Sequence, residues 1–205
     1  MGALIGMVKA KRSPGGPPFF DVVEQRVSVR KYRPDPVPDE HLELILDAAR
    51  LAPNAGNQQP CRYLVVRDRE KLEALKEDSI RHRLRWLEEE GYEVPEEGEL
   101  REHYDDVFSA PVYVLVLVDT TVKYKGYTDM DGGIAAAHIM LAARALGYGT
   151  VFYSGSVTEE LCRKHFGIPE KYRRVCMIPI GLPVEWPGRR KRLPLKKLVF
   201  HEKIN

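Results

Sequence analysis

The fold of this 205-residue chain is decided by the stretch Asp131–Leu146, with the sequence DGGIAAAHIMLAARAL. Residues 132–146 are apolar on almost every side, which predicts a buried helix rather than a surface helix. Gly147 follows directly, and glycine commonly ends helices because it accepts a left-handed backbone. The expected architecture is therefore built around a central helix.

The rest of the chain supplies strands and further helices in irregular alternation. Val112–Val118 is a β-branched run typical of a central strand. The other strands are expected at Tyr63–Arg67, Thr150–Tyr153 and Val175–Ile180. Helices are expected at Phe20–Gln25, from Asp39 to before Pro53, at Glu70–Asp78, Ile80–Glu90 and Thr158–Phe166, with a polar link up to Ser109. This pattern predicts an α+β fold with a buried central helix.

The domain organisation expected from composition is simple. Residues 1–18 end in a Ser-, Pro- and Gly-rich run that predicts a flexible tail. Residues 19–205 form a single domain, and residues 183–205 form a C-terminal arm rich in proline and basic residues. The apolar side chains of this arm would lie exposed unless they dock on another surface, and a second copy of the chain is the economical partner.

Composition excludes several classes of protein. Hydrophobic residues make up 43% and charged residues 30%, and the formal net charge is +2. With this share of hydrophobic residues the chain can bury a core, which argues against disorder. The balanced charge argues against a nucleic-acid-binding role for the surface as a whole. No apolar run approaches the ~18 residues of a membrane span. Cys61, Cys162 and Cys176 are far apart, which favours neither disulfides nor a zinc site. We expect a soluble cytoplasmic protein without a metal.

Three stretches carry chemistry. In Arg26-x-Ser28-x-Arg30, an extended chain points two guanidiniums and a hydroxyl to one face and Val27 and Val29 to the other. Such donors suit a phosphate monoester, although a solvated surface is the alternative. In the loop 53–60, the amides of Asn57 and Gln59 could bind the edge of a flavin or satisfy their own backbone.

The third stretch is the basic run Arg189-Arg190-Lys191-Arg192. It could be a solvated face, a nucleic-acid contact, or the completion of the phosphate site begun by Arg26 and Arg30.

Together these stretches resemble the FMN-dependent nitroreductase superfamily over about residues 19–200. The resemblance lies in Arg26–Tyr32 (RVSVRKY), Ala48–Pro60 (AARLAPNAGNQQP), Asp131–Gly149, and Gly181–Pro183 followed by Arg190–Leu195. Four motifs in the right order are specific, whereas any one alone is weak.

This resemblance implies a nitroreductase-like fold, in which a central, mostly antiparallel sheet is flanked by helices. It also implies an FMN site between two subunits of a homodimer, with the C-terminal arm exchanged between them. Arg26, Ser28, Arg190 and Arg192 would bind the FMN phosphate, and Arg30 would lie near the ribityl chain and the N1/O2 edge. The isoalloxazine would be lined by Pro53, Asn54 and Asn57, some from the neighbouring subunit. The segment Ser154-Gly155-Ser156 would place a backbone N–H, near Gly155, against flavin N5.

The implied activity is an NAD(P)H-dependent reduction of a nitroaromatic, quinone or similar flat acceptor by a ping-pong mechanism, with no dedicated catalytic side chain. Alternatives are a flavin reductase, a reductive dehalogenase or a flavin-dependent dehydrogenase of the same fold. From another class, a nucleic-acid-binding protein would use the basic arm.

Three features depart from the family pattern or stay open. The family often has Ser or Thr at Asn54, Trp at Cys61 and Asn at His138, which leaves the substrate pocket undefined. A buried, hydrogen-bonded histidine is the preferred interpretation of His138 over a proton donor, and Cys61 is interpreted as a lone buried thiol. Residues 77–108 form a variable, lid-like helical segment whose Trp86, Tyr92 and Tyr104 could stack on a substrate or belong to surface helices.

Overall fold

The computed structural model describes residues 19–155 and 157–204. The predicted tail, residues 1–18, and Ser156 lie outside this described part. Four strands form one antiparallel sheet in the order β1-β2-β4-β3. Their bounds are β1 Cys61–Val66, β2 Val112–Asp119, β3 Gly149–Thr150 and β4 Tyr172–Gly181.

Strand β2 is the centre of the molecule, since all eight of its residues are buried. Successive side chains of a strand point to opposite faces. Val112, Val114 and Val116 accordingly pack in one hydrophobic cluster, whereas Tyr113 and Leu115 pack in another on the opposite face. A strand covered on both faces reads as an unbroken hydrophobic run, as Val112–Val118 does. The predicted central strand is therefore confirmed.

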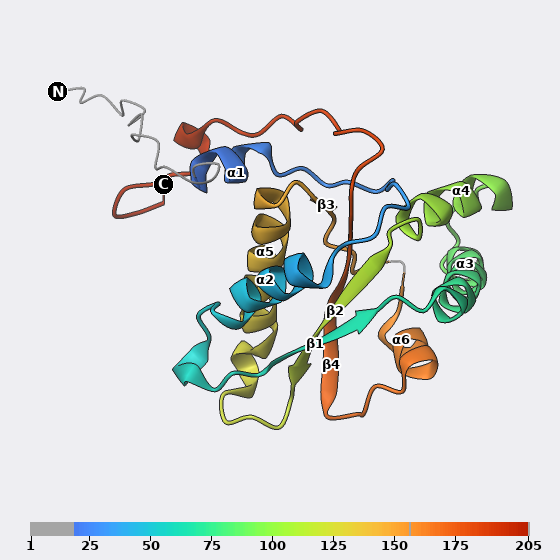
Figure 1. Cartoon of the computed structure of the whole chain (residues 1–205), viewed down its shortest axis with the longest axis horizontal. Helices are drawn as coiled ribbons and strands as arrows, with labels where there is room; N and C mark the ends of the chain where they lie inside the picture. The colour runs from blue at the N-terminus through green and yellow to red at the C-terminus, as the bar shows by residue number, and fades with distance from the viewer. Residues whose placement is uncertain (1–18, 156, 205) are drawn as a thin grey trace.

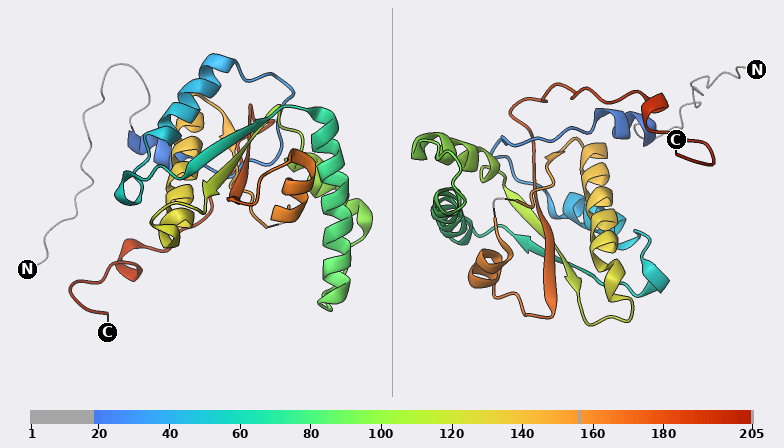
Figure 2. Two further views of the ribbon diagram at one scale, coloured as in Figure 1. Left: turned by 90° about the horizontal axis from the view of Figure 1, so that it is seen from below. Right: turned by 180° about the vertical axis from the view of Figure 1, so that it is seen from behind.

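Helices cover both faces of the sheet (Figures 1 and 2). On one face lie α2 (Asp39–Arg50) and α5 (Thr128–Ala145). On the other face lie α3 (Arg69–Glu89), α4 (Glu97–Val107) and α6 (Glu159–Phe166). The α+β fold and its central helix are thus as predicted, because α5 packs between α2 and the sheet.

Close approach explains the glycine at the start of α5. A Cβ on Gly132 would lie 2.5 Å from Val175 Cγ2 and 3.0 Å from Val118 Cγ1. On its remaining side α5 is not covered within the single chain, where Met130 is 58% and Ile134 38% exposed. The prediction of a helix buried on almost every side thus holds only toward α2 and the sheet.

The segment predicted as two charged helices is one helix, α3. Ser79 does not interrupt it, because its hydroxyl is buried and donates to Leu75 O at 2.7 Å. Leu72, Leu75 and Ile80 continue one buried face through that point. The prediction of two helices was wrong because tertiary packing outweighed the local preference of Asp78-Ser79 for a break.

The polar link expected before Ser109 is also wrong in part, since residues 97–107 form α4. Tyr104 and Val107 are both fully buried and lie three residues apart on one face. This helix was not predicted because most residues of the segment are charged, so its few apolar positions show no clear helical spacing in the sequence.

The extended segment 26–30 lies at the edge of the sheet beside β3. Ser28 forms a parallel bridge with Thr150, and Val29 N donates to Thr150 O at 3.0 Å. Strand β3 is shorter than the expected Thr150–Tyr153, but Tyr153 still bridges Met177 in the same register. The segment 26–30 therefore runs as an extra edge of the sheet.

The C-terminal arm follows β4, which ends at Gly181, and passes α1 (Phe19–Gln25) to reach the short turn η3, Leu195–Lys197, beyond which the chain continues (Figure 1). Its apolar side chains are half or more exposed at Leu193, Leu195, Leu198 and Phe200. Within residues 19–155 and 157–204, no helix has both the length and the apolar character to cross a membrane.

Candidate functional site

A cleft of about 780 Å³ lies between the segment 26–31, the end of α4 and the arm. Ligand pockets commonly enclose roughly 300–1,000 Å³. The cleft is lined by Val23, Glu24, Arg26, Val27, Ser28, Val29, Arg30, Lys31, Asp106, Glu185, Pro187, Gly188, Arg189, Arg190 and Arg192. All five side chains predicted to bind a phosphate or to lie beside it are in this set, although they come from opposite ends of the chain.

Local packing decides which side chains face the cleft. Val29 is 1% exposed and lies against Gly149, where an added Cβ would meet Val29 Cγ2 at 2.7 Å. Val27 also packs on the core. Because side chains alternate along an extended segment, Arg26, Ser28 and Arg30 point to the other side. The predicted alternation is confirmed.

The charge of the cleft is largely uncompensated. Lys31 pairs with Asp106 at 3.1 Å, and Arg189 pairs with Glu24 on α1. The hydrogen bond that Lys31 donates to Asp106 raises the pKa of Lys31. Over the described residues, no carboxylate lies within ion-pair distance of the other four guanidiniums, those of Arg26, Arg30, Arg190 and Arg192. Four unpaired cations and a serine hydroxyl are a donor set that fits a phosphate group.

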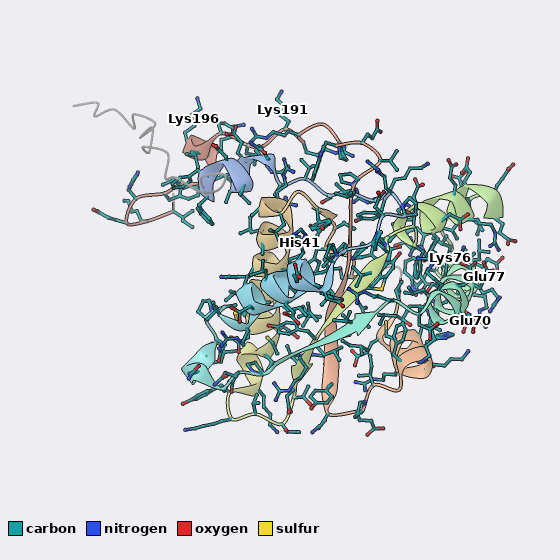
Figure 3. The ribbon with its side chains drawn as sticks, viewed as in Figure 1. His41, Glu70, Lys76, Glu77, Lys191 and Lys196 are labelled. Atoms are coloured by element: carbon teal, nitrogen blue, oxygen red, sulfur yellow. The ribbon has the colours of Figure 1, made fainter. Side chains whose placement is uncertain are left out.

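The arm is held beside this cleft by a small set of contacts. Val184 N donates to Lys31 O at 3.2 Å, and the guanidinium of Arg144 lies 3.9 Å from the Trp186 ring centre. Lys191 and Lys196 project away from the body of the protein (Figure 3), so the basic run is divided between the cleft and the solvent.

A second, smaller cavity of about 190 Å³ lies at the loop 53–60, between α2, β1 and α5. Pro53, Asn54 and Cys61 line it, whereas Asn57 is exposed and is not part of its lining. Asn54 Oδ1 accepts a hydrogen bond from Gln59 N at 2.8 Å, so this amide stabilises its own loop. Burial raises the pKa of Cys61 to about 11, with Asp131 adding to the effect, so the thiol stays protonated at neutral pH.

Two residues that sequence reasoning missed hold this loop. The buried carboxylate of Asp131 accepts from Ala55 N at 3.0 Å and from Gln58 Nε2 at 3.2 Å. The Gln58 amide also bonds the backbone of Tyr124 in both directions, at 2.8 and 3.2 Å. In the sequence, Asp131 stands out only as a carboxylate near the start of an apolar helix, and this position does not predict which residues it would bond.

The two clusters lie at opposite ends of α5. Asp131, near its start, bonds the loop 53–60, and Arg144, near its end, donates to Gln25 beside Arg26 at 2.7 Å. A helix rises 1.5 Å per residue, so these ends are about 20 Å apart. Figure 1 shows η1 (Ala55–Asn57) and α1 at these two ends. The structure of one chain therefore does not bring Pro53, Asn54 and Asn57 to the cationic cleft.

Ser154 and Gly155 follow the bridge of Tyr153 to β4, and both are exposed. Arg174 donates to Ser154 O at 3.2 Å and to Val157 O at 2.7 Å, which fixes the turn. The Gly155 N–H has no hydrogen-bond acceptor within residues 19–155 and 157–204.

The aromatic residues of the segment 77–108 do not share one role. Tyr104 is fully buried, so the expectation that it could stack on a substrate was wrong. Trp86 and Tyr92 stack on each other at 5.3 Å, near the far end of α3. His103 instead lies near the cleft, with its ring 6.4 Å from the Tyr153 ring, and sequence reasoning gave it no role.

Two other features need no ligand. His138 Nδ1 is 2.9 Å from Ile134 O, so the predicted hydrogen bond is present within its own helix, but the side chain is half-buried rather than buried as predicted. In the described part of the chain, no cluster of three or more His, Cys, Asp or Glu side chains is arranged for a metal ion.

Comparisons with known proteins agree with this arrangement. The chain is 34% identical to a "Putative NADH dehydrogenase/NAD(P)H nitroreductase" of Methanothermobacter thermautotrophicus over 175 residues, which cover 83% of this chain and 80% of the relative. It is 29% identical to the iodotyrosine deiodinase of Thermotoga neapolitana, over 80% of this chain and 88% of that protein.

A solved structure from Desulfovibrio desulfuricans, a "putative nitroreductase in complex with FMN", superposes with a TM-score of 0.71 at 26% identity. The match covers 93% of this chain and all of that one. The sequence model of the family described as "Nitroreductase family" matches residues 23–182 of this chain. Its motifs, its fold and this match over most of its length show that the chain belongs to the nitroreductase family.

Proposed function

We propose that this protein is an FMN-dependent oxidoreductase that takes hydride from NADH or NADPH and reduces a nitroaromatic, quinone or similar flat acceptor by a ping-pong mechanism. The observation that carries the proposal is the cleft itself. Arg26 and Arg30 from one end of the chain and Arg190 and Arg192 from the other face it without carboxylate partners in the described structure. The FMN complex of the Desulfovibrio relative supports the choice of cofactor.

The roles of the residues follow from their chemistry. Arg26, Ser28, Arg190 and Arg192 would bind the phosphate through charge-assisted hydrogen bonds. Arg30, on the same face of the extended segment, would lie beside the N1/O2 edge, where a fixed cation stabilises negative charge. The free N–H of Gly155 would face N5, with Ser154 and Ser156 beside it.

FMN would supply the hydride chemistry, and the protein would supply binding, orientation and electrostatics. No side chain of this chain is then required as a general acid or base. The arginines would hold the cofactor in the cleft.

A second copy of the chain would complete each site. Pro53, Asn54 and Asn57 lie about 20 Å from the cationic cleft of their own chain, by the length of α5 that separates them. The uncovered side of α5 and the apolar arm are surfaces that a two-fold related copy could cover. We therefore propose a homodimer of single-domain subunits, residues 19–205, in which the arm 183–205 is exchanged and residues 77–108 form a lid.

Purification tests the cofactor directly. The protein is expected to be yellow and to release FMN on denaturation. Arg26→Ala and Arg192→Ala should each lower the FMN retained, because each removes a cation from the phosphate group. Lys191→Ala is the matched control, since Lys191 projects away from the cleft (Figure 3). Unchanged flavin occupancy in both arginine variants would contradict the phosphate assignment.

A mixed dimer tests the shared site. Arg26→Ala in one chain and a bulky substitution such as Asn57→Trp in the other would leave one of two sites intact if the sites are shared. Half of the wild-type activity is then expected in the mixed dimer, and little in either variant alone. Activity in the mixed dimer as low as in either variant alone would argue for sites within one chain.

The iodotyrosine deiodinase relative favours one alternative, a reductive dehalogenase of the same fold. Steady-state rates with a nitroaromatic, a quinone and a halogenated tyrosine, each with NADH and with NADPH, separate these activities. A colourless protein with salt-dependent affinity for nucleic acid would instead support a binding role for the basic arm. We expect a cytoplasmic protein, in keeping with its three free cysteines.

A further inference from the structure

We propose that His103 binds the electron acceptor by a hydrogen bond from its imidazole N–H, beside Arg30 and at the end of the cleft where the flavin ring would lie. This inference rests on the proposed function, and it names the residue of the α3–α4 segment that recognises the substrate. The acceptor class it implies carries a carbonyl or nitro oxygen.

The position of His103 is fixed from its own helix. It lies three residues before Asp106 on α4, and residues three apart share one face of a helix. Asp106 lines the cleft and pairs with Lys31, the residue after Arg30. The same face of α4 therefore places His103 toward the segment that carries Arg30.

A second element places His103 independently. Its ring centre is 6.4 Å from that of Tyr153, with 37° between the ring planes. Tyr153 is held on β4 by backbone hydrogen bonds with Met177 of 3.0 and 2.9 Å, and it directly precedes Ser154 and Gly155. His103 thus lies beside the residue that leads into the turn of Gly155 and within reach of the charge of Arg30, and these two groups are the ones assigned to the flavin ring.

The imidazole is available for a ligand. His103 is exposed, and its ring nitrogens form no hydrogen bond with any residue that the structure describes. Burial and the charge of Arg30 lower its pKa, against an opposing effect of Asp106. At neutral pH the ring is therefore neutral, with one N–H donor and one acceptor nitrogen.

This donor is suited to the acceptor half of the reaction. Hydride transfer to a quinone or nitro group leaves an electron pair, and hence negative charge, on an acceptor oxygen. A neutral N–H donor placed at that oxygen, next to the fixed charge of Arg30, stabilises the charge as it develops. The proton that completes the reduction can come from water. Trp86 instead stacks on Tyr92 and lies under the guanidinium of Arg83.

The test compares His103→Phe, which keeps a ring but removes the hydrogen bond, with His103→Gln, which keeps a donor that does not titrate. The rate of reoxidation of the reduced holoenzyme by 1,4-benzoquinone should fall at least tenfold in His103→Phe and no more than threefold in His103→Gln. Reduction by NADH and the Kd for FMN should stay within twofold of wild type in both. His82→Gln, on α3, is the matched control and should change none of these.

Two further readouts exclude a merely structural role. Benzamide, a carbonyl compound that the enzyme does not reduce, should perturb the flavin absorbance of wild type at several-fold lower concentration than that of His103→Phe. As the pH falls below the lowered pKa of His103, which lies under the ordinary histidine value of about 6.5, the rate with benzoquinone should rise in wild type relative to His103→Gln, because imidazolium is the stronger donor.

The outcomes separate this inference from the function on which it rests. A wild-type protein that binds no FMN overturns the proposed function. A holoenzyme in which His103→Phe is reoxidised as fast as wild type, or in which the ratio of wild type to His103→Gln does not change with pH, overturns the role of His103 alone. If His103→Phe fails to bind FMN, the pH dependence of wild type against His103→Gln decides.

Discussion

The guanidinium carbon of Arg144 lies 3.9 Å from the centre of the Trp186 ring, and Arg144 Nη2 donates to Gln25 Oε1 at 2.7 Å. One side chain at the end of α5 thus joins the arm to the residue before Arg26. Both halves of the cationic cleft are positioned through this contact, although Arg144 does not line the cleft.

We expect Arg144→Ala to loosen the arm without removing any group from the cleft. A cation–π contact contributes roughly 0.5–2 kcal/mol, so the Kd for FMN should rise several-fold. Trypsin should also cleave the arm faster. Fluorescence titration with FMN and timed digestion measure the two effects. Arg50→Ala, which removes only an exposed pair with Asp47, is the control. An arm that is cleaved equally fast in both variants would contradict the anchoring role.

Two adjacent glycines of α5 should respond oppositely to alanine. In Gly132→Ala the new Cβ would lie 2.5 Å from Val175 Cγ2, and overpacking of this kind costs about 1–3 kcal/mol. In Gly133→Ala the new Cβ would have no atom of the described residues within 4 Å. The higher helix propensity of alanine should therefore stabilise this variant by up to about 1 kcal/mol. Urea unfolding at equal protein concentration measures both. Equal stability of the two variants would show that α5 can move away from the sheet to accommodate the new methyl group without a loss in the free energy of unfolding.

Asp131→Asn should destabilise the loop 53–60. The new amide would turn an N–H group toward Ala55 N or Gln58 Nε2, which are both donors, and a buried unsatisfied donor costs about 1–3 kcal/mol. Asp129→Asn is the control two residues away, because its carboxylate is exposed and pairs only with Arg173. Hydrogen exchange of the loop amides follows the effect. Faster exchange in Asp129→Asn than in Asp131→Asn would contradict the assignment.

Asp78 should make stability depend on pH. Hydrogen bonds from Lys164, Arg81 and His165 lower its pKa well below the ordinary value of a carboxyl. A lowered folded-state pKa means that the stabilisation is complete above the unfolded pKa, about 3.9, and is lost as pH falls through the folded value. Asp78→Asn should therefore be less stable than wild type at pH 7, by about 1–2 kcal/mol.

The difference between wild type and Asp78→Asn should shrink as pH falls below about 5. Thermal unfolding from pH 7 to pH 3 measures it. Asp68→Asn, an exposed cap of α3, is the comparison on the same helix. A difference that stays constant down to pH 3 would mean that folding does not lower the pKa of Asp78.

The sequence predicted the elements in which a local pattern and its environment agree. Val112–Val118 is hydrophobic throughout because both faces of the sheet are covered, and the stretch 131–146 is apolar because it packs between the sheet and α2. The alternation in residues 26–30 also fixed which side chains would share a face. These signals are local, so they can be read without knowing the partner elements.

Only the tertiary structure decided how distant segments meet. Ser79 continues a helix because Leu75 O accepts from its hydroxyl and the neighbouring turns are buried, which no local propensity states. The arm is held beside Arg26 through Arg144 and Trp186, and His103 approaches Tyr153 from α4. The physical reason is that a side chain's sequence neighbours determine its direction, whereas its contacts depend on chain segments up to 165 residues away, as for Arg189 and Glu24.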